Sequence, residues 1–312
     1  MNKNLGNILI TGGSGFIGSN LIYLLNKEYQ FKQIISIDNY FTGNKKNHIK
    51  SKKIIYLRLD TTKINKTNNK IFLNFKPNFV FHLAEFSRIV PSFKHIRDCY
   101  NFNVIGTFNV IQYSLKHNAK LIYSGSSSKF GKKDNQHLSP YSWTKSKNIE
   151  LIKNYNTWFG LRYSVVYYFN VYGFNQIRSH FMSAVIGIFE EQFMQNIPLT
   201  VVKPGNQKRD FTHVKDIVKG TVLAAVKGKN KEYQLGSGKN YKVLDVAKMF
   251  CNNIKYIKER DGERFTSLSN YSLAKNELGY KPDYNLEEYI KKFISKNHKK
   301  TYKKKLIKLN NF

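Results

Sequence analysis

Tyr141 and Lys145 carry the first chemistry that the sequence suggests, because they stand four positions apart in the segment Tyr-Ser-Trp-Thr-Lys. On a helix this spacing places both side chains on one face, where both can point into a cleft. A neighbouring ammonium favours a tyrosine phenolate, which can take the proton of an alcohol while a hydride leaves the same carbon. We choose Ser126 as the hydroxyl that bridges the substrate oxygen and the phenol. These three residues are the predicted catalytic group.

The Tyr/Lys spacing alone is a weak signal, because segments 23–27 and 271–275 have it too. The context of the pair is more specific. Only Tyr141 follows a predicted strand that ends in a serine-rich, glycine-flanked loop, residues 124–131. Ser139-Pro140 then introduces a predicted helix, since proline suits the first helical position.

Residues 11–18 form a glycine-rich turn, Thr-Gly-Gly-Ser-Gly-Phe-Ile-Gly, directly after the predicted strand 7–10. We expect Gly12 to make a tight turn, Gly15 to let a pyrophosphate approach the backbone, and Gly18 to let the following helix pack on the sheet. Glycine turns are common, but this position between a strand and a helix is typical of dinucleotide sites.

Asp38 ends the second predicted strand, about twenty residues after the glycine turn. A carboxylate there can accept hydrogen bonds from an adenosine ribose and repels a 2′-phosphate, which favours NAD over NADP. The alternative is that Asp38 caps the turn at Asn39. Asp60, after the third predicted strand, either holds the adenine amino group or serves only in a turn.

Short apolar runs alternate with longer amphipathic stretches in the first half of the chain, a pattern typical of βαβ units. We predict an α/β fold, with a doubly wound parallel sheet of Rossmann type and a smaller α/β C-terminal substrate lobe. The predicted strands are 7–10, 33–37, 54–57, 79–82, 120–123, 164–168 and 199–202, and the predicted helices are 15–25, 104–117, 141–157, 183–195 and 214–226.

The 312 residues are enough for one large domain with an appended lobe or for two domains. We predict an NAD-binding domain over 1–170, to which 211–235 returns, and a substrate lobe formed by 171–210 and 236–312. The Lys-rich tail from Lys296 is predicted to be a frayed, solvated end.

The formal net charge of +32, from 52 Lys and Arg against 20 Asp and Glu, suggests nucleic-acid binding as one alternative. The excess is mostly lysine, scattered along the chain among many Asn and Ile residues. A nucleic-acid groove needs cations focused on one face, often with arginine among aromatic side chains. We therefore predict a solvated basic surface and no nucleic-acid partner.

Cys99 and Cys251 are far apart and have no His or Cys at metal-ligand spacing, so neither a disulfide scaffold nor a metal site is predicted. The apolar N-terminal stretch is interrupted by glycines within 11–15, unlike a signal peptide. No stretch approaches the roughly 20 apolar residues of a membrane span. We expect a cytoplasmic protein with no membrane partner.

Taken together, these motifs resemble the extended short-chain dehydrogenase/reductase family, and within it the NAD-dependent sugar-nucleotide epimerases and dehydratases of the UDP-glucose 4-epimerase type. The similarity runs from Gly12 to about Leu286, and its motifs occur in the order typical of the family. The matching stretches are 11–18, 38–39, 82–84, 103 with 106–107, the serine loop, Tyr141/Lys145, 169–173, 207–211 and 260–263.

The resemblance implies which side chains hold the two ligands. For NAD it implies Gly12, Gly15, Phe16, Ile17, Asp38, Asn39, Asp60, Leu83, Ala84, Asn103, Tyr141, Lys145 and Phe169. It also implies that Asn170 bonds the substrate diphosphate or sugar and that Arg209 and Arg260 clamp the diphosphate, a task that suits guanidinium forks. A homodimer through the helices 104–117 and 141–157 is expected on the same ground.

The mechanism that the resemblance implies is a transient oxidation at C4 of a UDP-linked hexose, hexosamine or uronic acid. Tyr141 takes the hydroxyl proton, hydride passes to NAD, the 4-keto sugar rotates, and hydride returns to its other face. The predicted function is thus a 4-epimerase, an isomerase. The alternatives are a net dehydratase, decarboxylase or oxidoreductase on the same substrates, or a non-catalytic nucleotide- or RNA-binding protein.

Several positions depart from the family pattern. Ser127-Ser128 stand where sugar 4,6-dehydratases usually carry Asp-Glu and where decarboxylases keep a Glu, which disfavours both reactions. Glu85 replaces a usual small residue, and Arg88 and Lys129 are unusual beside the expected substrate pocket. We predict that Glu85, Ser126 and Arg88 contact substrate and that the sugar is not plain glucose. Other departures are Tyr167, where Arg is frequent, and a short loop between Gly131 and Ser139.

Overall fold

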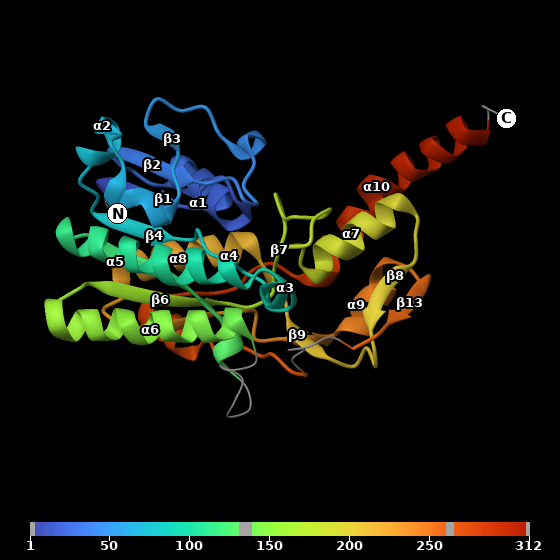
Figure 1. Ribbon diagram of the computed structural model, residues 1–312. Helices are drawn as coiled ribbons and strands as arrows, with labels where there is room; N and C mark the ends of the chain where they lie inside the picture. The colour runs from blue at the N-terminus through green and yellow to red at the C-terminus, as the bar shows by residue number, and fades with distance from the viewer. Residues whose placement is uncertain (1–3, 131–138, 260–264, 310–312) are drawn as a thin grey trace.

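The computed structural model describes residues 4–130, 139–259 and 265–309, with side chains up to residue 297 (Figure 1). Its centre is a parallel sheet of seven strands in the order β11-β6-β5-β4-β1-β2-β3. The strands are β1 (Asn7–Thr11), β2 (Gln33–Asp38), β3 (Ile54–Arg58), β4 (Phe79–His82), β5 (Lys120–Ser126), β6 (Tyr163–Tyr168) and β11 (Glu232–Leu235). The predicted parallel α/β fold is confirmed.

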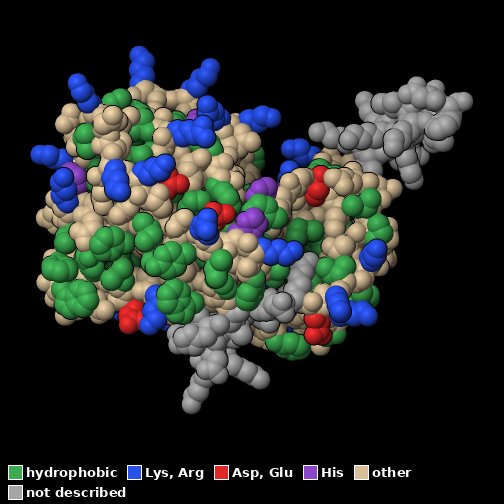
Figure 2. Space-filling model, viewed as in Figure 1, with side chains coloured by type: hydrophobic (Ala, Val, Ile, Leu, Met, Phe, Trp, Pro, Cys, Tyr) green, Lys and Arg blue, Asp and Glu red, His purple; other side chains and the backbone are tan. Residues whose placement is uncertain are grey.

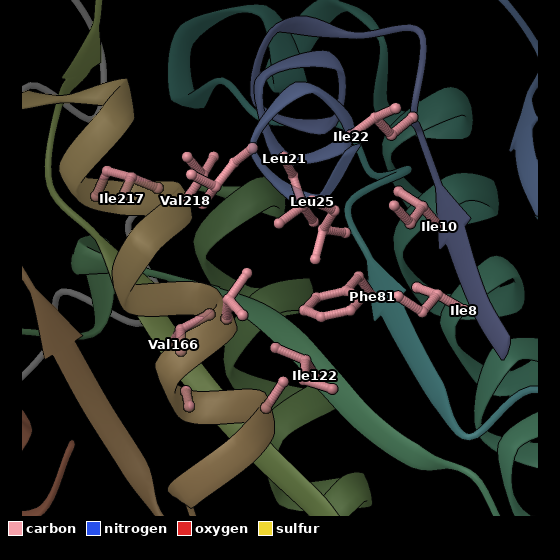
Figure 3. Packing of buried hydrophobic residues seen from close by; sticks show 14 of the residues in the cluster. Ile8, Ile10, Leu21, Ile22, Leu25, Phe81, Ile122, Val166, Ile217 and Val218 are labelled. Carbon is pink, nitrogen blue, oxygen red and sulfur yellow. The ribbon is translucent and has the colours of Figure 1, made fainter. Parts of the chain in front are cut away.

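Helices cover both faces of this sheet, which is why its strands read as nearly continuous apolar runs. The helices are α1 (Phe16–Glu28), α2 (Lys70–Leu73), α3 (Ile89–Lys94), α4 (Ile96–Tyr100), α5 (Gly106–Lys116), α6 (Pro140–Phe159) and α8 (Val214–Lys227). On one face α1 and α8 pack against the sheet, and Leu21, Leu25 and Ile217 belong to one buried core with Ile10 and Phe81 (Figure 3). On the other face α5 and α6 pack on the core that includes Leu9, Val80, Ile111 and Ile152.

The start of α6 is fixed by local sequence. Ser139 is the N-cap, and its hydroxyl accepts a hydrogen bond from the Ser142 amide at 3.1 Å, while Pro140 occupies the first turn. Gly160 ends the helix in the left-handed conformation with φ of 71°. The helix therefore begins where the sequence predicts, and Tyr141 lies in its first turn.

A smaller group of elements lies beside the carboxyl ends of the strands. It contains α7 (Val185–Gln195), β8 (Leu199–Val202) paired with β13 (Ile254–Ile257), β9 (Lys208–Asp210) paired with β12 (Asn240–Lys242), α9 (Val243–Phe250) and α10 (Leu286–Leu309). Its own core includes Phe189, Leu199, Phe250 and Ile290. The strands β7 (Val171–Tyr172) and β10 (Thr212–His213) pair where the chain passes between this group and the sheet.

The predicted frayed tail from Lys296 is wrong in one respect, because α10 continues through Leu309. Leu286 and Ile290 dock the first turns of this helix in the core, and lysines are good helix formers once a helix has begun. The last turns of α10 project away from the other elements (Figure 1). Among the described residues, no helix has both the length and the apolar character needed to cross a membrane.

Candidate active site

The strand order reverses between β1 and β4, and the segments that follow these two strands meet there. Doubly wound sheets bind ligands at such a switch point. Gly12 has φ of +73°, and a Cβ on it would lie 2.8 Å from the Leu83 carbonyl carbon. The Thr11 hydroxyl accepts hydrogen bonds from the amides of Leu83 at 3.1 Å and Ala84 at 3.2 Å. The tight turn therefore demands glycine at position 12.

Gly18 was expected to let the helix pack on the sheet, but in the structure Gly13 has this role. A Cβ on Gly18 would lie 2.2 Å from the Gly12 carbonyl oxygen, so Gly18 lets α1 pack on its own turn. A Cβ on Gly13 would lie 2.1 Å from the Ser36 hydroxyl of β2. Gly13 was not among the glycines predicted to have a role. Gly13 is thus the residue that allows close packing on the sheet, while Gly15 faces the cavity.

Asp38 lies buried at the end of β2, beside the glycine turn. Its carboxylate accepts hydrogen bonds from the amides of Ser14 at 2.9 Å and Tyr40 at 2.8 Å. Burial raises the pKa of Asp38, and these two hydrogen bonds oppose the rise. The Asp38 side chain caps the following turn and also lines the cavity, and its contact with a ribose stays a prediction.

One cavity of about 510 Å³ gathers most of the predicted site residues. Its wall includes Gly12, Gly15, Phe16, Ile17, Asp38, Asn39, Leu83, Ala84, Glu85, Arg88, Ser126, Tyr141, Lys145, Asn170 and Arg209. Arg260 and the short loop 131–138 lie outside the described residues. The carboxyl ends of β1, β2, β4, β5 and β6 supply one side of the cavity, and segments 177–188 and 200–209 supply the other.

Three predicted cofactor residues do not line this cavity. Asp60 caps the turn 61–66, and its carboxylate accepts from the Thr62 amide at 2.8 Å and the Asn39 amide group at 2.7 Å. Asn103 is fully buried, accepts from the Phe86 amide at 2.7 Å and donates to the Thr144 hydroxyl at 2.9 Å. Phe169 belongs to the core under α6. Asp60 and Asn103 thus bond to protein groups and Phe169 packs in the core, and the contacts of these three residues with NAD stay a prediction.

The predicted catalytic side chains face the same cavity. Ser126 ends β5, and its hydroxyl accepts a hydrogen bond from the Ser128 amide at 3.1 Å. Tyr141 is 8% exposed, and its backbone amide donates to the Ser92 hydroxyl of α3 at 3.3 Å. Lys145 is buried one turn further along α6. By contrast Tyr23, which has the same spacing to a lysine, is exposed on α1.

Glu85, which is predicted to contact the substrate, bonds to several protein groups in the structure. Its carboxylate forms an ion pair with the Lys145 ammonium, and the side chains are 2% and 6% exposed. The same carboxylate accepts hydrogen bonds from Tyr123 at 2.9 Å, Thr107 at 3.0 Å and Asn148 at 3.0 Å. Lys145 also donates to the Ser124 carbonyl at 2.6 Å. Glu85 is therefore paired with Lys145 and held in a network of protein groups.

Lys129 is also directed away from the cavity. Its ammonium pairs with the Glu232 carboxylate at 2.6 Å and donates to the Tyr167 hydroxyl at 2.9 Å. Burial alone raises the pKa of Glu232, but hydrogen bonds from Lys129, Lys153 and Tyr167 lower it to about 2. This cluster explains both Lys129 and the departure at Tyr167, and it joins β5 to β6 and β11.

Behind the side of the cavity that Asn170 and Arg209 line, the carboxylate of Asp210 is fully buried. It accepts hydrogen bonds from both the amide and the hydroxyl of Ser237, at 2.9 and 2.6 Å, and of Ser269, at 3.0 and 2.6 Å. The Asn170 side chain donates to the Asp210 carbonyl at 2.9 Å. Arg209 is the next residue along β9 and lines the cavity. Asp210 thus fixes the segments that position Arg209 and Asn170.

Several cavity residues were not selected from the sequence. Phe41, Ile89, Phe181 and Val185 form an apolar part of the wall, and no spacing in the sequence marks them because they come from separate loops and helix ends. Gln207 also lines the cavity, and it lies in the stretch 207–211 that matches the family. The family pattern could therefore have identified it together with Arg209.

A profile of the NAD dependent epimerase/dehydratase family matches residues 8–236. The chain belongs to this family. It is 31% identical to a protein of Methanocaldococcus jannaschii provisionally named UDP-glucose 4-epimerase, over 94% of this chain and all of that one. It is 26% identical to the dTDP-glucose 4,6-dehydratase of Haemophilus influenzae, over 92% and 96% of the two chains. The resemblance inferred from the motifs is confirmed, and it does not separate epimerases from dehydratases.

A solved structure shares the fold over nearly its whole length. It is the UDP-glucose 4-epimerase of Thermotoga maritima with UDP-glucose, with a TM-score of 0.84, 27% identity, and coverage of 96% of this chain and 99% of that one. The protein is therefore an enzyme of a nucleotide-sugar epimerase/dehydratase family, and NAD is its cofactor.

The described residues fit NAD. The turn at Gly12 and Gly15 leaves no side chain between the N-terminus of α1 and the cavity, where a pyrophosphate would be held. Asp38 lies at the end of β2, where its carboxylate would meet the ribose. Leu83 and Ala84, which follow β4, form the cavity wall on the other side of the switch point. No cluster of three or more potential metal-binding side chains occurs within the described part of the chain.

Proposed function

We propose that the enzyme is a nucleoside-diphosphate-sugar 4-epimerase that acts on a UDP-linked hexose, hexosamine or uronic acid. The observation that carries this proposal is the shared cavity of Ser126, Tyr141 and Lys145 at the mouth of the glycine turn. NAD supplies the hydride acceptor and donor for C4 when it is bound. The side chains then have to move only one proton and hold the sugar.

Tyr141 is the proposed base for the C4 hydroxyl, and it returns the proton at the end of the cycle. Ser126 is placed to bridge the sugar oxygen and the phenol, and its hydroxyl hydrogen is available because the Ser128 amide uses only an acceptor lone pair. Lys145 supplies positive charge that favours the phenolate. These are the roles expected of a base that must work near neutral pH.

The smaller lobe is proposed to hold the nucleotide handle. Asn170 and Arg209 line the cavity on the side away from the glycine turn, and both are placed by Asp210. Arg260 is proposed to join them, as the family pattern implies. A diphosphate fixed at this end lets the keto sugar rotate while it stays bound.

Dehydration and decarboxylation are the competing reactions on the same substrates. Ser127 and Ser128 are buried in the cavity wall, where they present hydroxyls and no carboxylate. This supports the epimerase over reactions that need an acid or base at those positions. A net oxidoreductase is distinguished by accumulation of NADH.

A role in nucleic-acid binding is not part of the proposal. The Lys and Arg side chains on the face in Figure 2 are spread over both groups of elements. This distribution supports a generally basic surface, which still attracts a diphosphate substrate by long-range steering.

We propose a homodimer through the helices α5 and α6. Hydrophobic side chains gather on the part of the face in Figure 2 where Figure 1 places α4, α5 and α6. The exposed large residues there are Ile96, Tyr100, Ile105, Phe108, Trp143, Trp158 and Phe159. Contiguous exposed apolar surface of this kind marks interaction sites. Sedimentation as a monomer at all concentrations would contradict this dimer.

The proposed compartment is the cytoplasm. Cys99 is buried and Cys251 is partly exposed, and both are free thiols. Free thiols suit a reducing environment.

The test of the proposed function follows the products of a UDP-sugar panel by proton NMR, with and without added NAD. Interconversion of C4 epimers without NADH accumulation is the expected result. A 4-keto or decarboxylated product would assign the enzyme to the dehydratase or decarboxylase branch. If no sugar is turned over, the alternative of a non-catalytic nucleotide- or RNA-binding protein is favoured.

A further inference from the structure

Arg88 lies in the cavity wall beside the catalytic tyrosine. It immediately precedes α3, and one turn later the Ser92 hydroxyl accepts the hydrogen bond from the Tyr141 amide. Both Arg88 and Tyr141 line the cavity. Arg88 is therefore part of the same cavity wall as Tyr141, to which the reacting carbon must come.

In the part of the chain that the structure describes, the hydrogen bonds of the Arg88 guanidinium all go to the neighbouring residue. Its Nη1 donates to the Ser87 carbonyl at 2.8 Å and to the Ser87 hydroxyl at 3.4 Å. Its Nε is buried and has no hydrogen-bond partner, and within the described residues no carboxylate forms an ion pair with this guanidinium. Burial lowers the pKa of Arg88, and Tyr141 opposes this effect. Arg88 is partly buried, and its Nε lies out of contact with water, so a ligand that supplies a counter-charge and an acceptor is favoured.

The other charged groups near Tyr141 already have protein partners. Lys145 is paired with Glu85, and Lys129 is paired with Glu232 outside the cavity. Of the three unusual residues that the sequence marked beside the substrate, only Arg88 presents an uncompensated charge to the cavity.

We propose that Arg88 binds a carboxylate on the sugar, so that the substrate is a nucleotide-linked uronic acid. This inference rests on the proposed 4-epimerase. A guanidinium fork matches the two oxygens of a carboxylate. With the C4 hydroxyl at Tyr141, the neighbouring ring carbons are C3 and C5, and C5 of a uronic acid bears the carboxylate. The diphosphate is attached at C1, across the ring from C4, so it belongs near Arg209 instead.

Rotation of the keto sugar adds a directional consequence. Turning the ring about the line through C1 and C4 exchanges the places of C3 and C5. Arg88 then faces the carboxylate in one bound orientation and the C3 hydroxyl in the other. The guanidinium therefore strengthens the binding of one C4 epimer more than that of its partner.

The test measures binding to the NAD-loaded enzyme by calorimetry, using UDP-glucuronate, UDP-galacturonate, UDP-glucose and UDP-N-acetylglucosamine. The variants are Arg88→Met and Arg88→Lys, with Arg58→Met, on the exposed edge strand β3, as the matched control. We expect Arg88→Met to weaken at least one uronate tenfold or more and to change UDP-glucose less than threefold. Arg88→Lys should restore part of the loss, and Arg58→Met should bind as the parent does.

Two results would overturn the assignment while leaving the epimerase proposal in place. One is an equal loss of affinity for all four sugars in Arg88→Met, which would mean that Arg88 acts on Tyr141 or on ring hydroxyls. The other is tighter binding of UDP-glucose than of both uronates by the parent enzyme, and this comparison holds even if Arg88→Met does not fold. Failure of every sugar to bind would instead reject the proposed function itself.

Discussion

The carboxylate of Glu85 forms a buried ion pair with the ammonium of Lys145, the residue expected to activate the catalytic tyrosine. The tip of the lysine side chain also contacts the Tyr123 ring, with Nζ 4.9 Å from its centroid. The pair therefore fixes where the lysine charge is located and offsets part of its field at Tyr141. Glu85 is a positioning residue in this arrangement, since its own contacts are all with the protein side of the site.

Replacing Glu85 by Gln should affect both stability and the pH profile. Breaking a buried ion pair costs about 3 kcal/mol, so urea unfolding should show a loss of this order. In the folded fraction, the uncompensated ammonium favours the phenolate more strongly, so the acid limb of kcat should move to lower pH. Glu150→Gln breaks the exposed pair with Lys147 and should cost less than about 1 kcal/mol. An unchanged pH profile in Glu85→Gln would show that the pair is purely structural.

Tyr141→Phe should remove the proton acceptor and leave the fold intact. We expect kcat to fall by about a thousandfold, as is usual when a general base is lost, with NAD binding retained. Tyr23→Phe is the matched control, because Tyr23 has the same spacing to a lysine but is exposed on α1. Comparable activity of the two variants would remove Tyr141 from the mechanism.

Asp210→Asn should loosen the substrate side of the cavity. The carboxylate holds Ser237, Gly238 and Ser269 by hydrogen bonds, and those to a charged acceptor are worth about 1.5 to 3 kcal/mol each. We expect a stability loss of about 3 kcal/mol and a higher KM, with a smaller effect on kcat. Asp283→Asn, at a half-exposed position 4.0 Å from Lys219, should change neither quantity. A fall in kcat without a change in KM would contradict this role.

His82 should make folding sensitive to mild acid. Burial lowers the pKa of His82 to about 4 from the ordinary 6.5, and its ring joins the hydroxyls of Thr11 at 2.7 Å and Thr107 at 2.9 Å. Between these two values the unfolded chain binds a proton that the folded chain does not. Its contribution to stability is therefore complete above pH 6.5 and decreases as the pH falls toward 4.

The slope from one such group is up to about 1.4 kcal/mol per pH unit, measurable by urea unfolding at a series of pH values. Burial lowers the pKa of His213 to about 4 as well, so part of the slope should remain in His82→Gln. A parent protein equally stable at pH 4.5 and 7 would contradict the prediction.

The sequence predicted those features that depend on local pattern. The strand ends, the glycine turn and the first turn of α6 each follow from a few neighbouring residues, and so Gly12, Asp38 and Tyr141 were placed at the cavity correctly. The partners of a side chain depend on distant segments. Glu85 meets Lys145 across 60 positions and Lys129 meets Glu232 across 103, so neither pairing is visible as a spacing. Glu85 and Lys129 stood out as unusual in the sequence, but the direction of each side chain was not predictable.

The place of β11 in the sheet has a consequence for how the protein is made. This strand pairs with β6, yet the chain between them, from residue 169 to 231, builds much of the second group of elements before β11 is reached. During synthesis β6 is therefore an unpaired edge until more than 60 further residues have been added, and an open edge invites pairing with other chains. A fragment ending near residue 210 would lack both β11 and α8, and it should aggregate instead of giving a free-standing cofactor domain.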